Sequence, residues 1–265
     1  NTAILGSVLL PDMLKRGYHP GIAMGPIMAT GGIAMLIPPS ALAVLLGSLA
    51  GMSITQLLIA GILPGILMSL LFVGYVVIRC HLQPELAPAY DVTDYTGWER
   101  WRPFVVHVLP LMMIFVVVVG SIVMGWATPT ESAALGSVAS LLLGALCGGL
   151  TRSAWHKILT ETAKISVMIL FIIAGSITFS QVLAFSGATD GLLQVVRDID
   201  PSPLMLLGLM VLVLLFLGMF MDQVSMAMIT IPFFLPMAEF AGIDLIWLGV
   251  LMLVIMEVSF TTPPF

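Results

Sequence analysis

The longest part of the chain without a charged side chain spans residues 17–78, where 62 consecutive positions hold no Asp, Glu, Lys or Arg. Further charge-free runs cover residues 103–130, 132–151, 165–189 and 201–221. A transmembrane helix needs about 20 such residues. Charged residues make up 9% of the 265-residue chain, against about 25% in soluble domains. The pattern predicts an all-α polytopic membrane protein. It excludes a soluble enzyme, a nucleic-acid-binding protein and a disulfide-stabilised secreted domain.

Prolines, glycines and charged residues divide the apolar runs into separate helical segments. We expect helices over residues 3–14, 20–37, 41–52, 54–78, 104–126, 130–150, 165–185, 204–218, 225–238 and 245–260. The last three segments are short, and at 1.5 Å per residue they cover about 21 to 24 Å of a hydrocarbon core about 30 Å thick. They are therefore expected to be re-entrant or broken helices. Residues 155–164 predict a separate short helix lying at the cytoplasmic interface.

Basic residues gather in three of the loops between these segments. They are Lys15 and Arg16 in the first loop, Arg79, Arg100 and Arg102 in the second, and Arg152, Lys157 and Lys164 in the third. The three loops fall on one side of the membrane if residues 20–52 cross it once as a broken helix. Because cytoplasmic loops carry an excess of Lys and Arg, we expect that side to be cytoplasmic.

The two ends of the chain contain an internal repeat. A displacement of 225 positions aligns residues 1–40 with residues 226–265 without a gap. The identities include Leu10–Pro11 with Leu235–Pro236, Gly17 with Gly242, and Pro38–Pro39 with Pro263–Pro264. Each copy predicts the second arm of a hairpin, a turn, and a helix interrupted by a proline pair. The turn is basic in the first copy and acidic in the second, so the charge rule places the turns on opposite faces. Inverted repeats with broken helices are the architecture of secondary transporters.

The proline pairs are expected to open the helices in which they lie. Proline has no N–H, so each pair releases carbonyl groups from the helical hydrogen-bond ladder. In hydrocarbon such groups must line a cavity or find a ligand. Together with the hydroxyl groups of Ser40, Thr261 and Thr262 they are suitable ligands for a small cation, while half-helix N-termini favour a carboxylate. The alternative for each pair is a plain kink sealed by neighbouring helices.

Asp222 and Glu257 are the acidic residues that this arrangement places near the middle of the membrane. Intramembrane carboxylates are costly and are by default functional, in pairing, ion binding or proton relay. Asp222 follows Gly218 at a predicted hairpin tip, where it could bind a cation or cap the next half-helix. Glu257 has two equal interpretations, a functional group or a packing hydrogen bond that holds the broken helix.

Other polar and aromatic features are interpreted as structural. Thr128 as N-cap, Pro129 at the first helical position and Glu131 at the third predict a capping box. Trp98 and Trp101 flank the polar loop and are typical of the membrane interface.

Four segments occur in a diagnostic order: Leu36–Ser40 after Gly31–Gly32, Ala127–Ala133, Gly218–Asp222 and Glu257–Pro264. Together they resemble signature segments of the large membrane subunit of the tripartite ATP-independent periplasmic (TRAP) transporters. Residues 84–88 are also similar to the family's long cytoplasmic loop. The resemblance covers essentially the whole chain. It implies that the chain is a piece of a longer permease that has further helices before Asn1 and after Phe265.

The resemblance implies a sodium-driven, elevator-type importer in the inner membrane of a bacterium. In this family a periplasmic binding protein delivers an organic acid to a complex of the large subunit and a small four-helix subunit. Na⁺ is the coupling ion, no other cofactor is expected, and the chain is not expected to be an enzyme.

The resemblance also implies where cations bind, namely where hairpin tips meet broken helices. One site would involve Asn1, Thr2, Gly31, Gly32, Pro38, Pro39 and Ser40, and its inverted counterpart Asp222, Ser225, Thr261, Thr262 and Pro263. Ser40, Asp222 and Thr262 are the candidates for substrate binding, whereas Glu257 and Pro264 are assigned to the structure of the broken helix.

Four regions follow from this assignment. Residues 1–80 form the first repeat, from the second arm of hairpin one to the span after the broken helix, and residues 81–103 form the cytoplasmic loop. Residues 104–203 are scaffold-type helices of the second repeat. Residues 204–265 form hairpin two and the first half of the second broken helix.

Two alternative functions stay open. The nearer is a stand-alone ion-coupled carrier of dicarboxylates or other anions in the same superfamily. The more distant is a membrane-embedded enzyme, such as an aspartyl protease using Asp222 and Glu257, although the sequence has no Gly-x-Gly-Asp segment. The sequence does not identify which carboxylate is carried.

Overall fold

The computed structural model describes residues 2–88 and 97–260, and these residues form helices with no strand among them. The first group comprises α1 (Thr2–Lys15), α2 (Pro20–Ile33), α3 (Ala41–Ala50), α4 (Ile54–Leu82) and the 3₁₀ turn η1 (Pro84–Leu86). The middle group comprises α5 (Trp98–Pro103), the π-helical turn η2 (Phe104–Val108), α6 (Leu109–Val123), α7 (Pro129–Leu146) and α8 (Arg152–Ser186). The last comprises α9 (Ala188–Ile199), α10 (Pro203–Gly218), α11 (Gln223–Phe240) and α12 (Leu245–Phe260).

Several helices are long and apolar enough to cross a membrane, which confirms the all-α polytopic class. Among the described residues there are four such spans, Ile54–Leu82, Trp101–Val123, Arg152–Ser186 and Gln223–Phe240. Helices α3, α10 and α12 are apolar but shorter, at 10 to 16 residues. The expectation of short segments is confirmed for α10 and α12, because about 20 residues are needed to span the core. It is wrong for residues 225–238, because α11 extends over 18 residues, Gln223–Phe240, and is long enough to cross.

The repeat predicted from the sequence is visible in the two turns that join α1 to α2 and α11 to α12. Gly17 and Gly242, which are 225 positions apart, both have a positive φ, 83° and 68°. In the first turn the N–H of Gly17 donates to Leu14 and that of Tyr18 to Met13. The equivalent bonds of the second turn run from Gly242 to Glu239 and from Ile243 to Ala238. Both helices therefore end in the same glycine-dependent cap.

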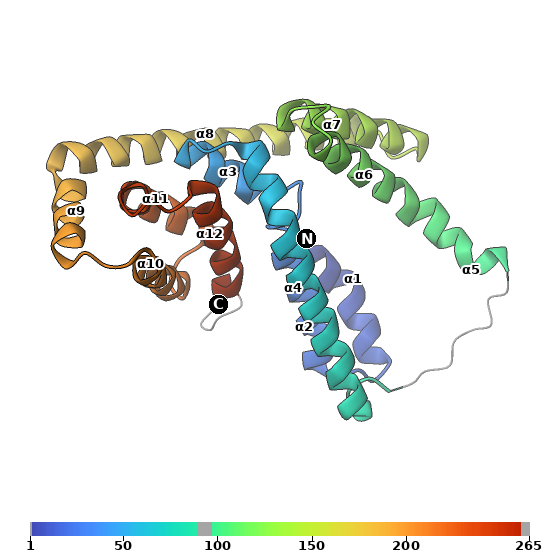
Figure 1. The fold of residues 1–265 in the computed structure, drawn as a ribbon. Helices are drawn as coiled ribbons and strands as arrows, with labels where there is room; N and C mark the ends of the chain where they lie inside the picture. Colours follow the sequence, from blue (N-terminus) through green and yellow to red (C-terminus); the bar gives the residue numbers. More distant parts are fainter. Residues whose placement is uncertain (1, 89–96, 261–265) are drawn as a thin grey trace.

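The two copies run in opposite directions. Figure 1 shows α2 leading toward α3 at the upper end of the molecule, whereas α12 leads down to the C terminus. The helices after the turns also start in register, since α2 begins at Pro20 and α12 begins 225 positions later at Leu245. The sidedness of the loops and the four-region division stay predictions.

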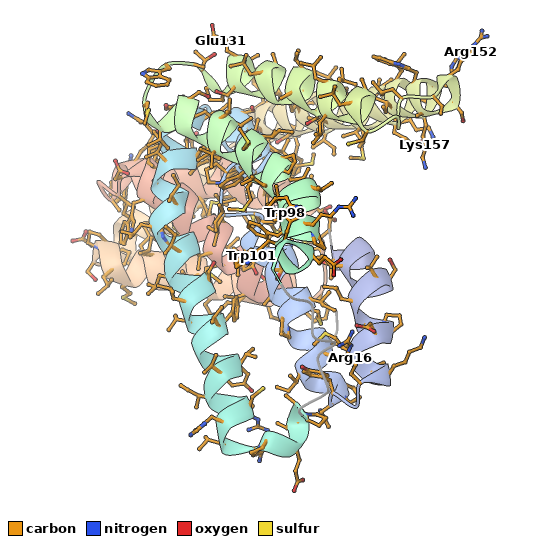
Figure 2. The ribbon with its side chains drawn as sticks, turned by 90° about the vertical axis from the view of Figure 1, so that its right-hand side faces the viewer. Arg16, Trp98, Trp101, Glu131, Arg152 and Lys157 are labelled. Atoms are coloured by element: carbon orange, nitrogen blue, oxygen red, sulfur yellow. The ribbon has the colours of Figure 1, made fainter. Side chains whose placement is uncertain are left out.

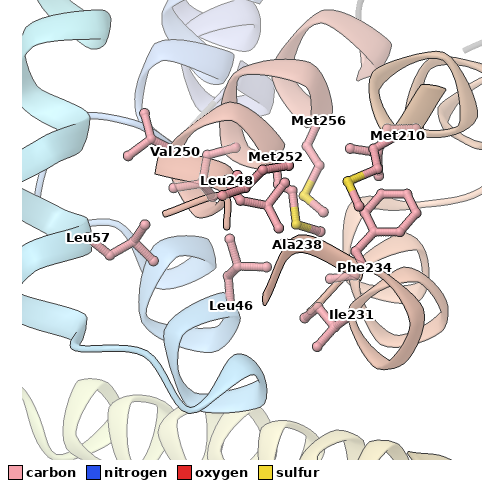
Figure 3. Close-up of a cluster of buried hydrophobic side chains, with 14 of the residues drawn as sticks. Leu46, Leu57, Met210, Ile231, Phe234, Ala238, Leu248, Val250, Met252 and Met256 are labelled. Carbon is pink, nitrogen blue, oxygen red and sulfur yellow. The ribbon is translucent and has the colours of Figure 1, made fainter. Parts of the chain in front are cut away.

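A core of buried apolar side chains joins the two repeat copies. Helices α3 and α4, which follow the first copy, both pack against α12, and α3 also packs against α11. Figure 3 shows Leu46 of α3 and Leu57 of α4 facing Leu248 and Met252 of α12. Because lipid tails are as apolar as leucine, such side chains stabilise a membrane-embedded core mainly through van der Waals packing. The core thus joins α12 to α3 and α4.

The first helix breaks earlier than the proline pair suggests. Residues 20–37 were expected to be one segment, but α2 ends at Ile33 and residues 34–40 form an irregular connection to α3. The Ile33 carbonyl accepts bonds from the N–H groups of both Leu36 and Ile37, which tightens the chain before the prolines. The reason is that Gly31 and Gly32 precede the pair, and glycine weakens a helix interior by about 1 kcal/mol relative to alanine.

The segment from Arg152 to Ile199 also differs from the expectation. The separate surface helix at 155–164 is wrong, because α8 is continuous over 35 residues from Arg152 to Ser186. At 1.5 Å per residue α8 is about 52 Å long, more than the bilayer core. The segment after α8 contains the amphipathic helix α9, which buries Val196 and places the Arg197 guanidinium 5.2 Å from the centroid of the Phe240 ring of α11. A cation above an aromatic face is attracted to it.

The pair α6–α7 confirms the predicted capping box. The Thr128 side chain accepts a bond from the Glu131 N–H, and the Glu131 carboxylate accepts one from the Thr128 N–H. The helices are joined by a buried contact of 2.7 Å between the hydroxyl oxygens of Ser121 and Ser132. In Figure 2 Glu131 and Arg152 lie at opposite ends of the α7–α8 layer.

Candidate functional site

The first part of the candidate site is the connection between α2 and α3. Ser40 is the N-cap of α3 and accepts a bond from the Ala43 N–H. Its hydroxyl also donates to the carbonyl of Met35, the group that Pro39 leaves without a helical partner. Ser40 is only 2% exposed. The Pro38–Pro39 peptide bond is cis. Ser40 thus provides hydrogen bonds to one carbonyl and one N–H at the break.

Helix α4 closes the outer side of the same connection. A Cβ on Gly61 of α4 would lie 2.7 Å from the carbonyl oxygen of Leu36, and one on Gly65 would lie 2.6 Å from Ile37. Such close approach is available only to glycine. Leu36, Pro38 and Ser40 of the break are buried, whereas Pro39 is exposed.

The second part of the site is the tip between α10 and α11. Asp222 is the N-cap of α11, and its Oδ2 accepts bonds from the N–H groups of Val224 at 3.0 Å and Ser225 at 3.1 Å. Its Oδ1 accepts the Ser225 hydroxyl at 2.6 Å. The expected association of Asp222 with Ser225 is present, in the form of a helix cap. A carboxylate at a helix N-terminus is also favoured by the helix dipole.

This tip packs directly against the second broken helix. A Cβ on Gly218 would overlap the Ser259 side chain of α12. Ser259 is 1% exposed, and its hydroxyl donates to the Ile255 carbonyl. A cavity of about 60 Å³ lies between the tip and α12, lined by Gly218, Met221, Asp222, Gln223, Met226, Met256 and Ser259. This volume can hold water or a small ion but is well below the 300–1,000 Å³ of organic-ligand pockets.

Gln223 is a polar lining residue that sequence reasoning missed. Its amide nitrogen is buried and has no hydrogen-bond partner among the described residues. Buried donors are normally paired, so this amide is poised to donate to a group outside the described structure. Gln223 directly follows Asp222 in the signature segment, and that adjacency was the signal available in the sequence.

The two repeat copies meet at the glycine pair. A Cβ on Gly31 would overlap the hydroxyl of Thr2, and one on Gly32 would overlap the Glu257 carboxylate. The structure thus brings Thr2 to Gly31, as expected for the first site. It also brings Glu257 to Gly32, a contact that the sequence did not indicate. The two complete cation sites stay predictions, because several of their residues lie outside the described ones. These residues are Asn1, Thr261, Thr262 and Pro263, and Pro264 also lies outside.

One helix broken between α2 and α3, a tip between α10 and α11 that packs on α12, and an oppositely directed repeat define a membrane transporter-type fold. The chain matches the family described as "Tripartite ATP-independent periplasmic transporter, DctM component" over residues 1–265. It therefore belongs to the TRAP transporter large permease family, as the signature segments predicted.

Curated relatives agree with this assignment and differ in what they carry. The chain is 32% identical to the C4-dicarboxylate TRAP transporter large permease protein DctM of Pseudomonas aeruginosa, over 99% of this chain and 60% of the relative. It is 30% identical to the sialic acid large permease SiaM of Vibrio cholerae, over 98% and 61%. The isethionate TRAP transporter permease protein DctMQ of Oleidesulfovibrio alaskensis is 27% identical, over 99% and 41%. The chain spans about 60% of the length of the first two.

Proposed function

We propose that the protein is the permease subunit of a sodium-coupled importer of an organic acid, working in the inner membrane of a bacterium. The observation that supports this most directly is the tip at Asp222, packed against α12 with an ion-sized cavity between them. The family match over the whole chain sets the class of protein. The relatives are named as transporter permeases, which argues against the membrane-embedded enzyme.

The substrate class follows from what the named relatives share. C4-dicarboxylates, sialic acid and isethionate are organic anions with carboxylate or sulfonate groups. The cavity beside Asp222 is too small for the organic acid itself, so we assign it to the cation.

Coupling is proposed to arise from the movement of the hairpin tip relative to the broken helix. Na⁺ bound between Asp222 and α12 would offset the cost of the intramembrane carboxylate and favour the packed arrangement of Gly218 on Ser259. The moving unit would be the core of α3, α10, α11 and α12, in an elevator-type cycle against the remaining helices.

The proposed partners are a periplasmic binding protein and a small four-helix subunit. The DctMQ relative is much longer than this chain, which covers 41% of it. In that relative, as its name suggests, we infer that the two membrane subunits are one polypeptide. For the present protein the small subunit is proposed as a partner without a choice between fused and separate forms.

Reconstitution in proteoliposomes tests the proposal. Proteoliposomes that contain the membrane complex are given an inward Na⁺ gradient and supplied with the binding protein. They should accumulate a C4-dicarboxylate, sialic acid or another organic acid. Replacing Na⁺ by K⁺ should abolish uptake, and so should omission of the binding protein. Uptake that needs neither would point instead to the stand-alone carrier.

A further inference from the structure

An apolar groove lies between α9, α10 and α11, which Figure 1 shows together at one side of the molecule. Helices α9 and α10 both pack against α11. The groove has a volume of about 710 Å³ and is lined from all three helices, for example by Leu192, Leu209 and Phe233. Its one polar lining side chain among the described residues is Thr230, whose hydroxyl already donates to the Met226 carbonyl. The lining side chains thus offer no unpaired polar group to a polar ligand.

Helix α9 turns its whole apolar stripe toward this groove. Leu192, Val195, Val196 and Ile199 all line it, and their spacing of three, four and seven residues places them on one face of the helix. Val196 is buried against α11, but Val195 is 52% exposed and Ile199 is 63% exposed. Helix α11 therefore covers one edge of the stripe and leaves the rest without a partner among the described residues.

The size of the groove favours an acyl chain over a further helix. A helix about 10 Å wide takes up about 420 Å³ for each turn of 5.4 Å, so the groove holds fewer than two turns. A hydrocarbon chain is narrower and flexible, and volumes of 300–1,000 Å³ are typical of sites for molecules of small-ligand size. On the α10 side the groove is open to the lipid phase, since Leu209 and Leu212 are 58% and 62% exposed.

A positive charge lies at one end of the groove. Val196 of α9 and Met237 of α11 both line it. Arg197 directly follows Val196, and Phe240 lies three residues beyond Met237, on the same face of α11. The Arg197 guanidinium lies over the Phe240 ring and is exposed, and it takes part in no ion pair among the described residues. Its N–H groups lie in the plane of the guanidinium, so a phosphate can bind at its edge.

Carboxylates surround this positive charge and determine which headgroup fits. Asp198 and Asp200 follow Arg197 in the chain, and Glu239 precedes Phe240. All three are exposed, and none is in an ion pair among the residues that the structure describes. A headgroup with a phosphate and an ammonium group complements both signs of charge. A headgroup with a net negative charge would meet the carboxylates without compensation, which selects against it.

We propose that the groove binds one phospholipid whose headgroup carries a phosphate and a primary ammonium group, as in phosphatidylethanolamine. Its acyl chains lie along the apolar stripe of α9, and its phosphate binds Arg197. The lipid would complete the packing of α9 on α10 and α11. The site shares no lining residue with the cavity at Asp222 and lies beyond the proposed transport function.

Photo-crosslinking in the intact membrane complex tests the proposal. Leu212 is replaced by the photoreactive p-benzoylphenylalanine, and the complex is placed in bilayers of phosphatidylethanolamine and phosphatidylglycerol in equal amounts. We expect the adduct with phosphatidylethanolamine to exceed that with phosphatidylglycerol by about threefold or more, because only the first headgroup avoids like-charge contacts. The matched control is the same replacement at Leu63 of α4, which is 77% exposed and should give the bulk ratio.

Two pairs of variants in the Leu212 probe assign the preference to the groove. Gly208 lines the groove and an added Cβ there meets nothing within 4 Å, so Gly208→Phe should fill the groove and return the adducts to the bulk ratio. Gly74→Phe on α4, where an added Cβ is equally free, should keep the preference. Arg197→Gln should lower the phosphatidylethanolamine adduct by about threefold or more, because a charge-assisted contact to phosphate is lost. Arg152→Gln, at an exposed arginine of α8, should not.

The probe at Leu212 alone is decisive if a variant does not fold. The bulk lipid ratio at this position would overturn the proposal. A crosslink to another helix of the same polypeptide would overturn it as well, and so would a crosslinked dimer, because each would show that protein fills the groove.

Discussion

Gly218, the last residue of α10, and Ser259, in the last turn of α12, are in direct contact, with no space between them for even one methyl group. The tip between α10 and α11 is thus in contact with α12 beside the cavity at Asp222. If either backbone moved away from the other, this cavity would open. This contact determines how closely the tip can approach the helix.

Gly218→Ala is expected to force the tip away from α12 and to lower uptake at least tenfold, while the protein still inserts in the membrane. The measurement is uptake in proteoliposomes at matched protein amounts. Gly208→Ala on the same helix is the control, because a Cβ at position 208 meets nothing within 4 Å. Equal uptake by the two variants would contradict the role given to the contact.

Substitutions of Asp222 should separate its capping role from its charge. Asp222→Asn keeps an oxygen that can accept from Val224 and Ser225, so we expect unchanged thermal stability but a higher Na⁺ concentration for half-maximal uptake. Asp222→Ala should in addition lose about 1 kcal/mol of stability through loss of the cap.

The control for the stability lost with an N-cap is Ser202→Ala, which removes the hydrogen bond from the Met205 N–H at the start of α10. This variant should lose stability without a change in the dependence on Na⁺. If Asp222→Asn also leaves the Na⁺ dependence unchanged, the carboxylate acts as a cap alone.

Ser40→Ala is expected to destabilise the protein because two backbone groups lose their partner. The Met35 carbonyl and the Ala43 N–H both rely on this hydroxyl, and a buried unsatisfied group costs about 1–3 kcal/mol. Chemical denaturation in detergent would measure the loss. Ser53→Ala, the N-cap of α4 with a longer bond of 3.4 Å to Gln56, should cost less. A purely functional serine would instead change Na⁺ dependence and leave stability intact.

Gly32→Ala should weaken the crossing of α2 and α12 because the new methyl group overlaps the Glu257 carboxylate. We expect a loss of about 1–3 kcal/mol, typical of overpacking. Gly25→Ala, on the same helix but with nothing within 4 Å of the added Cβ, should be neutral or slightly stabilising. In a double-mutant cycle, Glu257→Ala should reduce the cost of Gly32→Ala, and strict additivity would show that the two residues do not interact.

The sequence was a good guide wherever local chemistry decides the structure. Charge-free runs located the helices, Thr128 and Glu131 located a cap, and matching glycines located two equivalent turns. Each of these signals comes from a few neighbouring residues and does not depend on what the helix packs against.

The sequence was a poor guide where packing decides. The contact of Gly32 with Glu257 joins two residues 225 positions apart, and no local pattern indicated it. The continuity of α8 was missed because Lys157 and Lys164 interrupt the apolar pattern without interrupting the backbone ladder. At the candidate site, the association of Asp222 with Ser225 was implied by the resemblance to the family. The contact of Gly218 with Ser259 requires the folded arrangement of α10 and α12.

The matched turns at Gly17 and Gly242 have a consequence for how such a protein could evolve. Their caps use backbone groups and one glycine each, so the surrounding side chains are free to change without altering the bend. The glycine keeps the shape of the turn, while the neighbouring charges are predicted to set the direction of insertion. A duplicated ancestral segment could therefore acquire the opposite orientation through a few surface substitutions, while its glycine-dependent turn stays the same.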